Sequence, residues 1–110
     1  KDVRRPTLLT TAPRAETKAI TGIASVQPNP FNPQTTIHFS LASSAMVRVA
    51  IYDVTGSLVR RLVDETMSAG DHQARWDGMN DAGQGATSGV YFVRMIAGSH
   101  TEVRKIVLLK

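Results

Sequence analysis

The feature that most constrains the fold is a period-two alternation of apolar and polar residues, which recurs in short runs along the chain. In residues 35–41, TTIHFSL, Ile37, Phe39 and Leu41 fall on one face of an extended strand and polar side chains on the other. Residues 46–54 repeat this pattern, and no stretch longer than one turn has the period of a helix. The sequence therefore predicts an all-β fold.

Turn signals separate these runs. Asp53 to Gly56, DVTG, has the residue types of a type I turn, and Gly98-Ser99 has those of a two-residue hairpin turn. The other candidate strands fall at residues 23–26, 57–64, 72–76, 90–97 and 100–110. About seven short strands at intervals of roughly 8 to 12 residues predict an antiparallel β-sandwich of immunoglobulin-like type.

Several residues have expected places in this sandwich. The run at 90–97 is apolar on both faces apart from one arginine, which is typical of a central strand. Arg60 and Arg61 indicate a solvated edge strand, because charged edges discourage pairing between sheets. We expect Trp76 to anchor the core and Tyr91 to form a corner.

Residues 1–22 differ in composition and hydrophobic periodicity from the rest of the chain. They contain two prolines and no persistent period, which predicts a linker ahead of a single module at residues 23–110. The net charge is +4, of which this segment carries +3. A basic excess in an extended tail indicates a solvated linker more than a nucleic-acid-binding surface. Because the chain begins at Lys1 without a methionine, we expect a module of a longer protein.

Composition also excludes several classes of site. The chain has no cysteine, which excludes disulfides and thiolate metal ligands, and no apolar run is long enough to cross a bilayer. His38, His72 and His100 are far apart in sequence and have no patterned acidic partner. No hydrolase signature occurs, so we expect neither catalysis nor a cofactor.

One loop offers hard oxygen ligands. Asp77, Asn80 and Asp81 lie among glycines in a stretch that could bind calcium, although the spacing does not fit an EF-hand. The same residue types are ordinary turn formers, so we expect no metal there. GQGATS, residues 83–88, precedes a strand and is interpreted as a turn. Sugar binding would require an exposed Trp76 or Tyr52.

The order and spacing of several motifs resemble a known bacterial module over about residues 25–110. These motifs are PNPFNP, YDVTG, WDG and SGVYF, followed by a terminal KIVLLK. The family is the type A C-terminal sorting domain of type IX secretion cargo, which is related to the immunoglobulin-like domain of the flagellar hook-capping protein. The residues that we assign to its structural motifs are Pro28, Asn29, Pro30, Phe31, Asn32, Pro33, Tyr52, Asp53, Gly56, Trp76, Asp77, Gly78, Gly89 and Tyr91.

The resemblance implies a non-catalytic C-terminal module of a larger secreted or surface-attached bacterial protein. It implies sorting by an outer-membrane translocon or attachment to a cell-surface component, with catalytic or adhesive domains upstream and no nucleic acid or membrane insertion. The implied partner contact is Val103, Arg104, Lys105, Ile106, Val107, Leu108, Leu109 and Lys110. An exposed terminal strand suits such recognition, because its backbone can pair with a partner. The alternatives are a purely structural or spacer immunoglobulin-like domain, similar to that of the hook cap, and a carbohydrate-binding module.

The PNPFNP stretch predicts a structural corner. Proline lacks an N–H group, so its prolines mark where pairing between the first two strands stops. We expect the asparagine amides to bond to backbone within the turn. We expect Phe31 to fold back and plug one end of the sandwich.

Overall fold

The computed structural model describes residues 20–110, and all of its regular elements are strands. They are β1 (Gly22–Gln27), β2 (Thr35–Leu41), β3 (Ala45–Tyr52), β4 (Leu58–Met67), β5 (Gly70–Trp76), β6 (Gly89–Ala97) and β7 (His100–Leu108). These bounds confirm the all-β prediction and the seven predicted runs. The predicted linker lies largely outside the described residues. Within the described part of the chain, no helix could cross a membrane.

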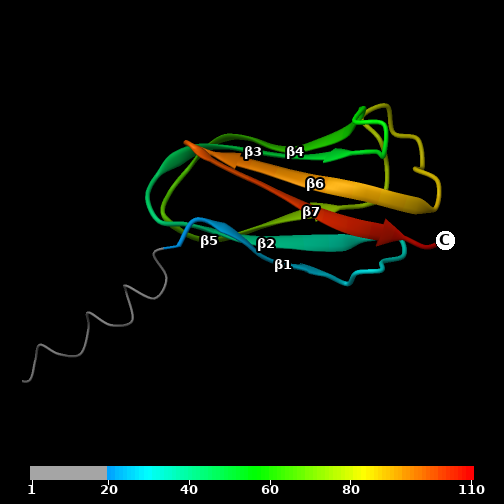
Figure 1. The fold of residues 1–110 in the computed structure, drawn as a ribbon, viewed down its shortest axis with the longest axis horizontal. Coiled ribbons are helices and arrows are strands. Elements are labelled where there is room, and N and C mark those ends of the chain that lie inside the picture. The colour runs from blue at the N-terminus through cyan, green and yellow to red at the C-terminus, as the bar shows by residue number, and fades with distance from the viewer. Residues whose placement is uncertain (1–19) are drawn as a thin grey trace, which may run out of the picture.

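The strands form two antiparallel sheets packed face to face (Figure 1). The three-stranded sheet has the order β1-β2-β5, and the four-stranded sheet has the order β4-β3-β6-β7. This arrangement confirms the immunoglobulin-like sandwich. The strand β6 lies between β3 and β7, as its apolar faces predict, and β4 lies at an edge, as its arginine pair predicts.

Alternation along the strands fills the space between the sheets. In β2 and β3, every second residue is buried while its neighbours are partly or fully exposed. Each fully buried large apolar side chain stabilises the fold by about 1.5 to 3 kcal/mol. The largest of these side chains are Trp76, Phe31, Phe39, Ile37, Leu41, Ile51, Met95, Ile106, Leu108, Val47, Val49 and Val93.

An aromatic cluster occupies one end of this core. The Trp76 ring lies 5.3 Å from the Phe31 ring and 5.3 Å from the Tyr91 ring, centroid to centroid. Trp76 is fully buried and Phe31 is 2% exposed, which confirms both predictions. The Tyr91 hydroxyl donates to the Thr87 carbonyl oxygen at 2.6 Å, so Tyr91 forms the expected corner.

The predicted turns are also present. The Gly56 N–H donates to the Asp53 carbonyl oxygen at 3.0 Å, closing the turn between β3 and β4. The Asp53 carboxylate accepts from the Thr55 hydroxyl and from the Ser57 N–H, and these bonds lower the pKa of Asp53. Ala97 pairs with His100 across Gly98-Ser99, which confirms the two-residue hairpin.

Candidate functional site: the C-terminal strand and the segments that close over it

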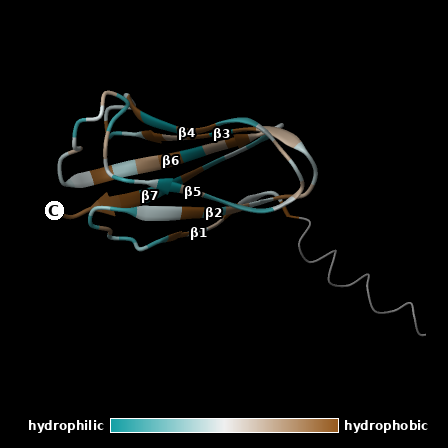
Figure 2. Ribbon diagram, turned by 180° about the vertical axis from the view of Figure 1, so that it is seen from behind, coloured by the Kyte–Doolittle hydropathy of each residue, from teal (hydrophilic) through white to brown (hydrophobic). Residues whose placement is uncertain are grey.

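The strand β7 pairs with β6 along its full length and forms an edge of the four-stranded sheet. Its residues pass from hydrophilic to hydrophobic toward the C-terminus (Figure 2). Of the predicted contact residues, Ile106 and Leu108 are fully buried and belong to the core. Val103 is 54% exposed and Leu109 is 52% exposed. Only part of the predicted segment is therefore accessible to a partner.

The PNPFNP stretch bonds to the free edge of β7. The Val107 N–H donates to Asn29 Oδ1 at 3.0 Å, and Asn29 Nδ2 donates to the Lys105 carbonyl oxygen at 3.3 Å. The Phe31 N–H donates to the Val107 carbonyl oxygen at 2.9 Å, and the Leu109 N–H donates to the Phe31 carbonyl oxygen at 2.9 Å. Phe31 and Leu108 form a parallel bridge here.

These bonds correct two expectations. The edge of β7 is not open between Lys105 and Leu109, because Asn29 and Phe31 already occupy its backbone groups. The amide of Asn29 bonds to β7 rather than within its own turn. A partner that pairs with this part of β7 would have to displace the chain's own residues.

Side chains join the first half of β7 to β1. The Ile23 N–H donates to Glu102 Oε1 at 3.0 Å, and Arg104 Nη2 donates to the Ile23 carbonyl oxygen at 2.7 Å. Arg104 Nε also donates to Glu102 Oε2 at 3.1 Å. The pairing of β1 with β2 is irregular at this point, between Ile23 and Ser25. The edge of β7 that faces the three-stranded sheet is thus covered in two parts. Side-chain bonds to β1 cover its first half, and the PNPFNP stretch covers its second half.

The bonds of Glu102 and Arg104 to Ile23 were not predicted from the sequence, although a signal was present. Glu102 and Arg104 have the same parity along β7 as the buried Ile106 and Leu108. The Glu102 side chain is 23% exposed and the Arg104 side chain is 43% exposed, and charges that are even partly removed from water favour positions with hydrogen-bond partners. The partner that the sequence could not supply is the backbone of Ile23.

Two opposing effects act on the pKa of the Glu102 carboxyl group. Burial acts to raise its pKa, but hydrogen bonds from the Ile23 N–H, His100 and Arg104 together lower the pKa below its ordinary value. The His100 ring nitrogen lies 3.1 Å from Glu102 Oε1. Because the folded-state pKa is lowered, the carboxylate stabilises the fold above its unfolded pKa, and this contribution is lost as the pH falls through the folded value.

We expect Glu102→Gln to lower the free energy of unfolding by about 1 kcal/mol at neutral pH, because the charge-assisted hydrogen bonds that the Glu102 carboxylate accepts are weakened. This deficit should shrink as the pH falls through the lowered pKa of Glu102, because the wild-type carboxyl then becomes protonated too. Urea unfolding at a series of pH values measures it. Glu65→Gln, at an exposed position on β4, is the control. A deficit independent of pH would contradict the assignment.

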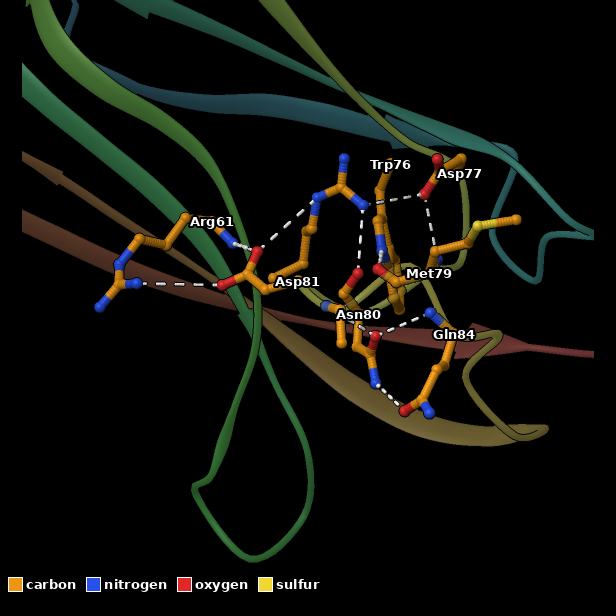
Figure 3. Close-up of polar contacts among 9 residues, drawn as sticks. Arg61, Trp76, Asp77, Met79, Asn80, Asp81 and Gln84 are labelled. Atoms are coloured by element: carbon orange, nitrogen blue, oxygen red, sulfur yellow. Dashed lines mark hydrogen bonds and ion pairs between the residues drawn. The ribbon is translucent and has the colours of Figure 1, made fainter.

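The loop after Trp76 covers the edge of β4 (Figure 3). Trp76 Nε1 donates to the Met79 carbonyl oxygen at 2.9 Å, which satisfies the one polar group of the buried indole. The Asp81 N–H donates to the Val59 carbonyl oxygen at 2.9 Å, and the Arg61 N–H donates to Asp81 Oδ1 at 3.1 Å. The loop therefore protects this edge, as natural β-proteins commonly require.

The oxygen atoms considered for calcium face other partners. Asp77 Oδ1 accepts from the Met79 N–H at 3.0 Å, and Asn80 Oδ1 accepts from the Ala82 N–H at 3.0 Å. Among residues 20–110, no three His, Asp or Glu side chains are grouped so as to hold a metal ion. The geometry of the loop is accounted for by turns whose side chains bond to nearby backbone.

Arg60 corrects the interpretation of the arginine pair as solvated. Its side chain is 32% exposed and lies 3.6 Å from Asp77 Oδ1 and 3.8 Å from Asp81 Oδ1. Arg60 therefore links β4 to the loop, whereas Arg61 is 66% exposed at its side chain. The Trp76 indole is fully buried, so it supplies no platform for a sugar.

The sequence model of the FlgD Ig-like domain matches residues 26–100. The chain belongs to the FlgD Ig-like domain family. This family is non-enzymatic. No curated protein sequence matches the chain.

Three solved structures share the fold of this FlgD Ig-like domain. Dimeric latent PorU from Porphyromonas gingivalis has a TM-score of 0.66 at 21% identity, over 79% of this chain and 9% of that one. PorZ, a surface component of the type-IX secretion system of the same organism, has a TM-score of 0.57 at 22% identity, over 81% and 12%. FlgD from P. aeruginosa has a TM-score of 0.51 at 23% identity, over 67% and 59%. The chain spans less than two thirds of each.

Proposed function

We propose that this FlgD Ig-like domain is a non-catalytic C-terminal module of a larger secreted bacterial protein, acting in secretion sorting or cell-surface attachment. Membership of a non-enzymatic family supports a module without catalysis. PorZ is described as a surface component of the type-IX secretion system, and the shared fold covers 12% of its chain. This supports a module joined to other domains, on the cell surface or secreted.

The presentation of Leu109 and Lys110 beyond β7 carries the proposal. The Leu109 N–H is bonded to the Phe31 carbonyl oxygen, and the Lys110 N–H donates to Ser88 Oγ at 2.9 Å. The backbone of the chain end is therefore held in place, while the Leu109 and Lys110 side chains are exposed. A partner such as a secretion translocon or a surface component would meet one aliphatic and one basic side chain in a defined position.

The test fuses the complete 110-residue chain to the C-terminus of a reporter with an export signal, in a bacterium that has a type IX secretion system. The variant Leu109→Ser/Lys110→Ser keeps the buried part of β7 intact. Deletion of residues 103–110 would remove Ile106 and Leu108 from the core and would confound recognition with unfolding. The matched control, Val54→Ser/Arg75→Ser, removes one exposed aliphatic and one exposed basic residue elsewhere.

We expect the reporter to reach the surface with the wild-type module and with the control. We expect the Leu109/Lys110 variant to reduce surface reporter at least about fivefold, which corresponds to about 1 kcal/mol of recognition. Thermal unfolding of the purified variants verifies that both remain folded. Equal surface signal from all three fusions would refute the role of Leu109 and Lys110. Equal surface signal with and without the module would refute the sorting role itself.

A structural spacer is the second candidate. The match to the FlgD Ig-like domain and the shared fold with FlgD favour it. It predicts that the module leaves the reporter in the periplasm whether or not Leu109 and Lys110 are present. The fusion experiment therefore separates the two functions.

A further inference from the structure

The register of the four-stranded sheet places a row of large basic and small or aliphatic side chains across its outer face. Arg61, Ala50, Arg94 and Val103 are direct cross-strand neighbours on β4, β3, β6 and β7. Cross-strand neighbours on one face have Cβ atoms about 5 Å apart. The smallest side chain therefore lies between two arginines.

A hollow of about 480 Å³ opens over Ala50. Arg48, Arg61, Arg94 and one carboxylate, Asp64, line it together with Tyr52. Three guanidinium groups and one carboxylate leave an excess of positive charge around the hollow, and this favours an anionic group. A carboxylate fits this chemistry, because its two oxygens accept paired bonds from a guanidinium.

The three arginines differ in their existing partners. Arg48 Nε lies 3.2 Å from Asp64 Oδ1, and Arg61 Nη1 lies 3.9 Å from Asp81 Oδ2. Within residues 20–110, no carboxylate lies within ion-pair distance of Arg94, whose guanidinium sits 6.0 Å from the centre of the Tyr52 ring. Arg94 is therefore the guanidinium most available to an incoming carboxylate.

Apolar side chains flank the hollow. Leu58 is 38% exposed and Val103 is 54% exposed, and Phe92 lies beside Tyr52 in the register. Arginine, tyrosine and phenylalanine together are enriched at protein interfaces. The outer face of the other sheet instead presents mainly polar residues such as Thr36 and Gln73, and its strands contain a single arginine, Arg75.

We propose that this face is a docking surface for a protein partner that inserts an aspartate or glutamate side chain into the hollow over Ala50. The chain's own residues 1–22 carry a charge of +3, so they are repelled by the arginines. A second copy would present the same arginines, so pairing of two such faces is also repulsive. A polysaccharide needs an open aromatic platform, but Arg94 lies over Tyr52 and Trp76 is buried.

This inference does not rest on the proposed function. It concerns the outer face of β3, β4 and β6, whereas the sorting proposal concerns the chain end. The failure of one proposal would leave the other standing, because the fusion experiment changes neither Ala50 nor Arg94.

The probe is a phage-displayed library of random dodecapeptides, selected on the complete 110-residue chain. We expect selected peptides to share an aspartate or glutamate flanked by apolar residues. A synthetic peptide of the consensus is then titrated by calorimetry against three variants. Arg94→Gln removes the available charge, Ala50→Leu fills the hollow without changing charge, and Arg75→Gln removes a positive charge on the opposite sheet.

We expect Arg94→Gln and Ala50→Leu each to weaken binding about tenfold, and Arg75→Gln to leave it within about twofold. All three positions are on outer faces, so thermal unfolding should show folded variants. Peptides without a shared carboxylate, or equal binding by all three variants, would overturn the proposal. Oligogalacturonate bound as tightly as the peptide, with the same loss in Arg94→Gln, would overturn the assignment of a protein partner.

Discussion

Replacing Phe31 by alanine is expected to lower the free energy of unfolding by about 3 kcal/mol, because it leaves a cavity in the core that cannot fully collapse. The Phe31 side chain is 2% exposed and packs against Trp76, while its backbone bonds to β7 on both sides. Urea unfolding monitored by Trp76 fluorescence measures the loss. The effect should be larger than that of most single substitutions.

Phe92→Ala is the matched control, since it removes the same ring from a partly exposed position on the outer face of β6. Phe92→Ala should lower the free energy of unfolding by less than about half as much as Phe31→Ala, because less apolar area is buried at position 92. A loss below about 1 kcal/mol for Phe31→Ala would show that Phe31 does not close the core. The large loss would mean that PNPFNP is a structural corner and not a recognition site.

Gly78→Ala is expected to lower the free energy of unfolding by about 3 kcal/mol, for two reasons that add. Gly78 has a backbone φ angle of +81°, a conformation that residues with a side chain rarely adopt. A Cβ atom there would lie 2.8 Å from the carbonyl oxygen of Pro33, and backbone cannot move aside as a flexible side chain can. The WDG turn and PNPFNP therefore approach too closely for any residue but glycine.

Gly83→Ala separates these two reasons. Gly83 has a φ of +82°, but nothing lies within 4 Å of the position that its Cβ would take. We expect a loss of only about 1 kcal/mol, from backbone strain alone. Thermal unfolding of both variants gives the comparison. Equal losses at the two positions would mean that the contact with Pro33 carries no cost.

The strands were predictable because each is encoded locally. The alternation in β2, the apolar character of β6 and the DVTG turn each depend on neighbours in sequence, and all were confirmed. The burial of Phe31 and Trp76 also followed from residue type, because large aromatic side chains dominate the cores of small domains.

The candidate site was predicted less completely. Residues 106–109 form a continuous apolar run, so the sequence alone did not separate the buried Ile106 and Leu108 from the exposed Leu109. That Asn29 and Phe31 occupy the edge of β7 was not foreseeable either, because which segment covers an edge depends on the path of the whole chain. The role of Arg60 was likewise invisible, since Asp77 lies on a different element.

By itself, the sequence determined the strands, the turns and the side chains that face the core, because these follow from periodicity and turn chemistry over a few residues. Only the tertiary structure decided how the sandwich is closed and where its outer face is hollow. Ile23 and Glu102 are 79 residues apart, and Asn29 and Val107 are 78 apart. The hollow over Ala50 depends equally on cross-strand register, which brings Arg61 and Arg94 to either side of it.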